Sequence, residues 1–127
     1  MIYSLLSVGI GGAIGAILRY LISSLASSHG GAFFPYGTVL VNLAGSFCIG
    51  FLMAFFSLHT QLSPQTKLFL VTGCLGGLTT FSTFQYEWLT LFQSGMTASF
   101  FWYGGLQIAG GFLLCWLGTV LGSSWFS

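Results

Sequence analysis

Charged side chains are nearly absent from this sequence. Two of its 127 residues are Lys or Arg and one is acidic, which gives a formal net charge of +1. A soluble domain of this size could not cover its surface with so few charges, so we expect a lipid bilayer as its solvent. The sequence also lacks the basic run that a nucleic-acid partner would require. Membrane lipid is therefore the first expected partner.

Cysteine is scarce, and it follows no pairing pattern. The chain has three cysteines, Cys48, Cys74 and Cys115, each alone within an apolar segment. An odd number without a C-x-x-C pair predicts neither a disulfide framework nor a zinc site. The N-terminus has no positive region and begins an apolar run too long for a signal peptide, so we expect the mature chain to keep it.

What the sequence does contain is long apolar runs. Apolar residues make up 55% of the chain, and the mean hydropathy is +0.94. More than 20 residues at about 1.5 Å each exceed a hydrocarbon core of roughly 30 Å. We therefore predict one all-α integral membrane domain over residues 1–127. Its four transmembrane helices are expected at about residues 2–26, 38–58, 65–92 and 97–122.

The third of these runs contains a stretch that a continuous helix disfavours, from Gly73 to Glu87. Each glycine there weakens a helix by roughly 1 kcal/mol relative to alanine. Hydroxyls follow that can bond freed backbone groups, those of Thr79, Thr80, Ser82 and Thr83. Broken helices in membranes direct peptide dipoles and bare carbonyls at ions. We predict a break near Gly76–Thr80 that forms an ion site, and a glycine-rich packing surface remains the alternative.

Small residues recur at spacings of four in the first and last spans. Gly11 and Gly15 form one G-x-x-x-G pattern, and Gly118 and Gly122 form another. Such faces let helices approach closely. Four helices enclose little space, so we expect copies of the chain to associate.

Polar residues also recur at spacings of four, which places each set on one helix face. The second span carries Thr38, Asn42 and Ser46, and the fourth carries Tyr103, Gln107 and Gly111. In the third span Phe81 and Phe84 share a face beyond the break. Aromatic ring edges and amide N–H groups can face an anion without a trapping cation. Such a lining suits an anion that must both enter and leave, although packing alone would also account for the two rings.

Glu87 and Arg19 are the charged residues that fall more than one turn inside the predicted spans, whereas Lys67 lies at the start of the third. An intramembrane carboxylate is a functional candidate by default, yet a glutamate near the interface bonded by Thr, Tyr or Asn is the interpretation we favour. A carboxylate deep in an anion pore would repel the ion. Arg19 can reach the headgroups or pair with a carbonyl.

The few positive residues give no firm orientation. Arg19 and His29 fall toward one side of the membrane, whereas His59 and Lys67 fall toward the other. The positive-inside rule therefore has nearly equal weight on both sides. A chain that inserts both ways can form an antiparallel dimer, although other signals could fix its topology.

Three stretches together resemble the signatures of the Fluc/CrcB family of fluoride channels. They are GGAIGAILRY at Gly11–Tyr20, PYGTVLVNLAGSFCIGF at Pro35–Phe51 and GGLTTFSTFQYE at Gly76–Glu87. They occur in the family's order, and the hydropathy agrees over essentially the whole chain. The resemblance implies an antiparallel, dual-topology homodimer in a prokaryotic plasma membrane, with two fluoride pores and a structural sodium ion at its centre.

The resemblance also implies roles for single residues. Phe81 and Phe84 would line the fluoride path, Asn42 would be the pore asparagine, and the carbonyls of Gly76 and Thr79 from both subunits would hold the sodium. Further matches to the family's polar path or first-helix arginine are Thr38, Ser82, Glu87, Tyr103 and Arg19. Where the family often places hydroxyls along the fourth helix, this chain has Gln107, Gly111 and Cys115. Gln107 could supply donors in their place.

The function expected from these residues is passive, selective export of fluoride, with no reaction and hence no enzyme. One alternative is a small proton-coupled multidrug exporter, also a four-helix antiparallel dimer, which would use Glu87. Such exporters resemble one another by a glutamate in the first helix, which this first span lacks. Another alternative is a non-transporting assembly subunit, in which Asn42 and Phe81 could be changed without effect on flux.

Phe81→Ile is expected to reduce fluoride flux severely while the dimer stays assembled, because the substitution removes a ring edge from the path and keeps the apolar volume. Flux from proteoliposomes and the mass of the purified assembly measure the two effects. Full flux in this variant would remove Phe81 from the path.

Overall fold

The computed structural model describes residues 1–30 and 34–127 of the chain, so Gly31, the end of the polar run after the first span, lies outside the described residues. The described residues are helical with short connections and contain no strand. Four helical spans are long and apolar enough to cross a membrane, namely Ile2–His29, Tyr36–Leu58, Pro64–Gln93 and Thr97–Trp125. The predicted number and order of the spans are confirmed.

The first span, α1 (Ile2–His29), runs one turn beyond its predicted end near residue 26. The polar residues at this end continue the helix because their hydroxyls bond carbonyls of the preceding turn. Ser27 donates to Ser23 O at 2.8 Å, and Ser28 donates to Leu25 O at 2.7 Å. The second span is α2 (Tyr36–Leu58).

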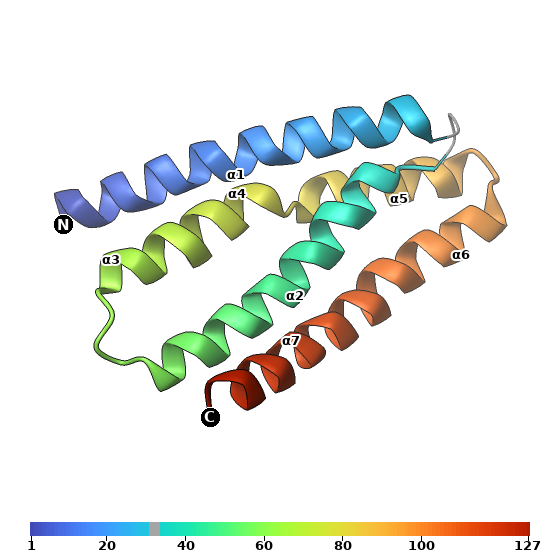
Figure 1. Cartoon of the computed structure of the whole chain (residues 1–127). Helices are drawn as coiled ribbons and strands as arrows, with labels where there is room; N and C mark the ends of the chain where they lie inside the picture. Colours follow the sequence, from blue (N-terminus) through green and yellow to red (C-terminus); the bar gives the residue numbers. More distant parts are fainter. Residues whose placement is uncertain (31–33) are drawn as a thin grey trace.

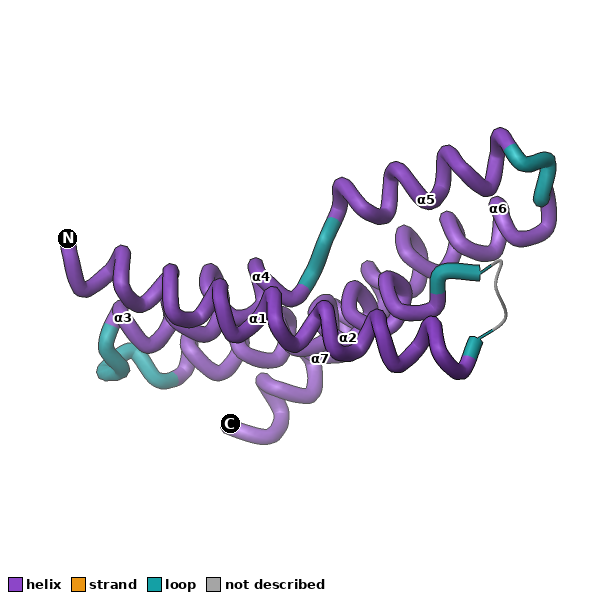
Figure 2. Tube along the Cα trace, turned by 90° about the horizontal axis from the view of Figure 1, so that it is seen from above, coloured by secondary structure: helices purple, strands orange, loops and turns teal. Residues whose placement is uncertain are grey.

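The third span is broken, and the break is shorter than predicted. It comprises α3 (Pro64–Lys67), the π-helical η1 (Leu68–Leu75), α4 (Gly76–Leu78) and α5 (Phe81–Gln93). Gly76 has helical backbone angles, φ −62° and ψ −36°, whereas Thr79 and Thr80 are extended. The break therefore falls at the C-terminal end of the predicted range. Figure 2 shows α5 displaced sideways from α4 at this point.

The fourth span comprises α6 (Thr97–Gly105), the π-helical η2 (Leu106–Gly110) and α7 (Gly111–Phe126). The two π segments were not predicted. Such segments often accompany functional sites because they turn side chains out of the regular helical register. In the fourth span the π segment contains Gln107.

Glycine determines how closely α1 packs against the third span. A Cβ on Gly11 would overlap the carbonyl oxygen of Phe69, and one on Gly15 would overlap that of Cys74. From the other side, a Cβ on Gly77 would lie 2.5 Å from the carbonyl oxygen of Gly12. The two backbones are therefore in direct contact, as the G-x-x-x-G pattern predicted, but this small-residue face packs within one chain and not between copies. Figure 1 shows α1 lying along α3 and α4.

The second contact of this kind joins α2 to α7. A Cβ on Gly50 would overlap the carbonyl oxygen of Cys115, and one on Gly118 would overlap that of Phe47. The last G-x-x-x-G pattern is thus also confirmed as a packing face. A small cluster of buried side chains forms the core between α2, α5 and α6. It consists of Val39, Phe84, Leu91 and Tyr103. This cluster lies beside the break.

Gly15→Ala is expected to destabilise the fold by about 1–3 kcal/mol, because the added methyl group overlaps backbone that cannot rotate away. Unfolding in mixed detergent micelles, followed by circular dichroism, measures the change. Gly9→Ala is the matched control on the same helix, since a Cβ there meets nothing within 4 Å. Equal stability of the two variants would contradict the close-contact account.

Candidate ion site

The backbone at the break is held by a single side chain from another span. Thr80 N–H donates to Asn42 Oδ1 at 2.8 Å, and Asn42 Nδ2 donates to the carbonyl oxygen of Thr80 at 3.0 Å. One amide therefore satisfies both backbone polar groups of an extended residue near the middle of a span. Unpaired, these groups would cost several kcal/mol in lipid, so the pair explains how the break persists.

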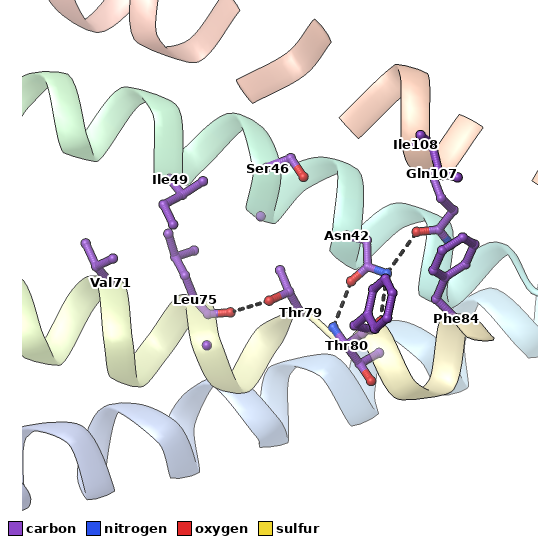
Figure 3. Close-up of a pocket in the computed structure, with 13 residues that line it drawn as sticks. Asn42, Ser46, Ile49, Val71, Leu75, Thr79, Thr80, Phe84, Gln107 and Ile108 are labelled. Carbon is purple, nitrogen blue, oxygen red and sulfur yellow. Dashed lines mark hydrogen bonds between the residues drawn. The ribbon is translucent and has the colours of Figure 1, made fainter. Parts of the chain in front are cut away.

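Asn42 also joins the second span to the fourth. Its Nδ2 donates to Gln107 Oε1 at 2.8 Å (Figure 3). Both Asn42 N–H groups are thus directed at protein oxygens. The sequence predicted these groups as donors to an anion, whereas the structure uses them to connect three spans.

The break frees the carbonyl oxygens of the turn before it, including those of Gly76 and Thr79. In an unbroken helix, the N–H groups of Thr80 and Thr83 would donate to the carbonyl oxygens of Gly76 and Thr79. Here Thr80 N–H donates to Asn42, and Thr83 N–H donates to Thr80 Oγ1 at 3.3 Å. Gly76 is exposed and Thr79 is half-buried. The two carbonyls predicted as sodium ligands are therefore among those that lose their helical donors.

Of the four predicted hydroxyls, that of Thr80 bonds a freed backbone group at the break. Thr80 caps the N-terminus of α5 by accepting from Thr83 N–H, and its Oγ1 also donates to Thr83 Oγ1 at 3.0 Å. Thr79 Oγ1 donates to Leu75 O at 2.9 Å. The 13-residue α5 therefore begins at the break with a defined cap, and its positive dipole end lies there.

Phe81 and Phe84 lie next to each other at the start of α5 but differ in burial. Their ring centroids are 5.9 Å apart in an edge-to-face arrangement. Phe84 is 4% exposed and packs on Tyr103 and Trp88, whereas Phe81 is 72% exposed. The predicted sharing of one helix face brings the two rings into contact, but only Phe84 is covered by other side chains of its own chain.

A cavity of about 420 Å³ adjoins Asn42, Thr80 and the two Phe rings. The face of the molecule onto which this cavity opens is called the open side below. It is lined from α2, the third span and the fourth span, and Figure 3 draws the lining side chains of these three spans. Its lining includes Asn42, Ser46, Gly76, Thr79, Thr80, Phe81, Phe84 and Gln107. None of the lining residues is charged.

Glu87 lies outside this cavity in a separate hydrogen-bonded cluster. Thr38 Oγ1 donates to its Oε1 at 3.1 Å, and the Tyr103 hydroxyl donates to its Oε2 at 2.5 Å. The hydrogen bonds expected for Glu87, from Thr and Tyr side chains, are present, and its expected place near the membrane interface stays a prediction. The cluster ties α5 to both the second and the fourth spans.

Arg19 and Ser82 lie apart from the Asn42 cavity. Arg19 is half-buried beside a hollow of about 290 Å³ whose lining also includes Thr38, Thr83 and Glu87. Ser82 is exposed and does not line the cavity. The structure therefore brings together most of the predicted path residues in two neighbouring groups, without Ser82.

The comparisons with known proteins identify the family. Residues 6–119 match the family model described as CrcB-like protein, Camphor Resistance (CrcB). The chain belongs to the CrcB family. The family resemblance inferred from the three sequence stretches is thereby confirmed.

CrcB relatives match over most of their length. A protein of Aquifex aeolicus is 44% identical over 119 residues, covering 93% of this chain and 95% of the relative. One from Acidobacterium capsulatum is 42% identical over 116 residues, covering 91% and 93%. One from Clostridium perfringens strain 13 is 51% identical over 90 residues, covering 71% and 70%. Each of these relatives is named fluoride-specific ion channel FluC.

Two features of this CrcB site were missed from the sequence. Thr80 was expected only as a hydroxyl, whereas its backbone is the partner of Asn42. The bond between Asn42 and Gln107 joins residues 65 positions apart. The available signal was that both residues belong to polar stripes spaced by four, which puts each stripe on an inward face.

Asn42→Ala is expected to lower the free energy of unfolding, because it orphans both backbone groups of Thr80 at about 1–3 kcal/mol each. Chemical unfolding in detergent measures the loss, and amide hydrogen exchange at Thr80 is expected to accelerate. Ser46→Ala is the matched control, one turn along the same face. Unchanged exchange at Thr80 in Asn42→Ala would contradict the pairing.

Proposed function

We propose that this chain is a fluoride-selective channel that exports cytoplasmic fluoride passively down its electrochemical gradient and so relieves fluoride toxicity. The observation that carries the proposal is the uncharged cavity at the helix break, which combines amide groups, aromatic rings and a helix N-terminus. The name shared by the relatives, fluoride-specific ion channel, supports the choice of ion. No reaction is required, so the proposed protein is not an enzyme.

The chemistry of the cavity favours an anion that binds and leaves. The positive end of the α5 dipole and the edge of the Phe81 ring offer partial positive charge. The lining carries no Lys or Arg that would hold the anion permanently. Fluoride is small and strongly hydrated, so conduction requires groups that replace its water without trapping it.

We also infer an antiparallel homodimer with two pores. Phe81 is 72% exposed and Gly76 is exposed, so polar backbone and the open cavity would face lipid in a single copy. Bare backbone is not tolerated against lipid, which favours cover by a second copy. The even distribution of positive residues over the two sides supports insertion in both orientations.

A structural sodium ion at the dimer centre is consistent with the groups at the break. Carbonyl oxygens suit a hard cation, and the carbonyls of Gly76 and Thr79 lose their helical donors on the open side. In an antiparallel dimer, the Gly76 and Thr79 carbonyls of one copy would meet those of the other copy at the two-fold axis. The ion would hold the copies together at the point where each helix is broken.

The location proposed for the protein is the plasma membrane of a prokaryote, crossed several times by each chain. The four apolar spans and the bacterial relatives support this location.

The proton-coupled exporter is not favoured. Its carboxylate would have to release and bind protons next to a site for a lipophilic cation. Glu87 instead receives two hydroxyl donors within a packed cluster and lies outside the open cavity.

Proteoliposomes loaded with potassium fluoride and potassium chloride test the proposal. With valinomycin to carry potassium, the purified protein is expected to release fluoride rapidly and retain chloride, without a proton gradient. Phe112→Ile, a change on an exposed ring of α7 outside the cavity, is the matched control for Phe81→Ile and is expected to keep full flux. Release of both anions at one rate, or of neither from folded protein, would contradict fluoride selectivity.

A further inference from the structure

We propose that Gln107, and not Asn42, presents amide N–H donors to the permeating anion. The inference rests on the fluoride-channel function proposed above and identifies a ligand within that channel. It depends on how the side-chain amides of Asn42 and Gln107 are oriented. It also depends on which of their N–H groups already donate to protein oxygens and which do not.

The hydrogen-bond network fixes which way each amide points. A backbone N–H can only donate, so the Asn42 atom at 2.8 Å from Thr80 N must be its oxygen. Asn42 nitrogen therefore faces the Thr80 carbonyl and Gln107. Because that nitrogen can only donate, the Gln107 atom at 2.8 Å from it must be oxygen. Gln107 Nε2 is then the end of the network.

Asn42 has no donor left for an ion. A primary amide carries two N–H groups, and those of Asn42 donate to Thr80 O and Gln107 Oε1. Offering either group to an anion would leave a protein oxygen unpaired within the membrane span. Asn42 is therefore a positioning residue, which holds the break and orients Gln107.

Gln107 Nε2, by contrast, keeps its N–H groups available. It is buried, and within the described part of the chain it has no hydrogen-bond partner. Buried donors are almost always paired, so an orphan of this kind indicates a ligand or ordered water. Gln107 and Phe84 both line the cavity, and Figure 3 shows the Gln107 oxygen directed at Asn42. The free donor thus belongs to a residue at the aromatic part of the cavity.

The acceptor that suits this donor is a small, partly dehydrated anion. The neighbouring hydroxyl of Tyr103 donates to Glu87, and its oxygen could still accept, but Gln107 Nε2 makes no hydrogen bond to it. An amide N–H pair offers two strong donors with no net charge, so an anion gains contacts there without meeting a fixed cation. In this chain, Gln107 supplies on the fourth span the donors that hydroxyls would otherwise provide.

Fluorine-to-nitrogen dipolar dephasing in the solid state tests the assignment on wild-type protein in lipid bilayers. Asn42 is the only asparagine, and the Gln107 signal among five glutamines is identified by its loss in Gln107→Met. With sodium fluoride, side-chain amide ¹⁵N of Gln107 is expected to dephase more strongly than that of Asn42. Matched sodium chloride gives no dephasing at either.

The outcomes separate this inference from the proposed function. Stronger dephasing at Asn42, or none at Gln107, in protein that conducts fluoride would overturn the inference and leave the channel intact. The second of these results would assign ordered water to Gln107 Nε2. Protein that neither conducts fluoride nor shows dephasing would instead refute the channel.

A substitution gives an independent readout. Gln107→Met keeps similar length and removes both donors, so fluoride flux is expected to fall about tenfold or more. Stability is expected to change little, because removal of the unpaired Nε2 donor offsets the loss of the oxygen that accepts from Asn42 Nδ2. Leu106→Met, on the same π segment but outside the lining of the cavity, is the control and should conduct normally. Full flux in Gln107→Met would contradict the assignment.

Discussion

The structure depends on one interaction, the pairing of the Asn42 amide with both backbone groups of Thr80. A break in the middle of a membrane span is unfavourable unless its polar groups are satisfied by protein. Asn42 satisfies them from a different span, and by doing so it diverts the N–H that would otherwise close the helix onto Gly76. The same bond therefore permits the break, frees a carbonyl oxygen and points the amide nitrogen at Gln107.

Close glycine contacts make this arrangement geometrically possible. With Gly11 and Gly15 against the third span, α1 lies against the backbone of η1 and α4 and holds the first half of the broken helix. The second half is held separately, by the bonds from Thr38 and Tyr103 to Glu87. Each half of the third span is thus fixed to its own neighbours. The break between the halves, at Thr79 and Thr80, lines the cavity.

Hydropathy and residue spacing predicted the four spans, the glycine faces and a break in the third span, because these depend on local composition and on helical periodicity. The position of the break within Gly76–Thr80 could not be predicted, since it depends on which residue meets Asn42. Likewise, spacing placed Phe81 and Phe84 together, but their different burial comes from the packing of Tyr103 and Trp88. The homodimer and the sodium ion stay proposals, supported by exposed Gly76 and Phe81.

The most direct measurement of the central claim is the zero-current potential of the protein in a planar bilayer with opposed fluoride and chloride gradients. The account predicts a potential that follows the fluoride gradient alone and is unchanged when proton or sodium gradients are altered, because the cavity offers neutral donors to a small anion. A potential that follows chloride, sodium or protons would contradict it.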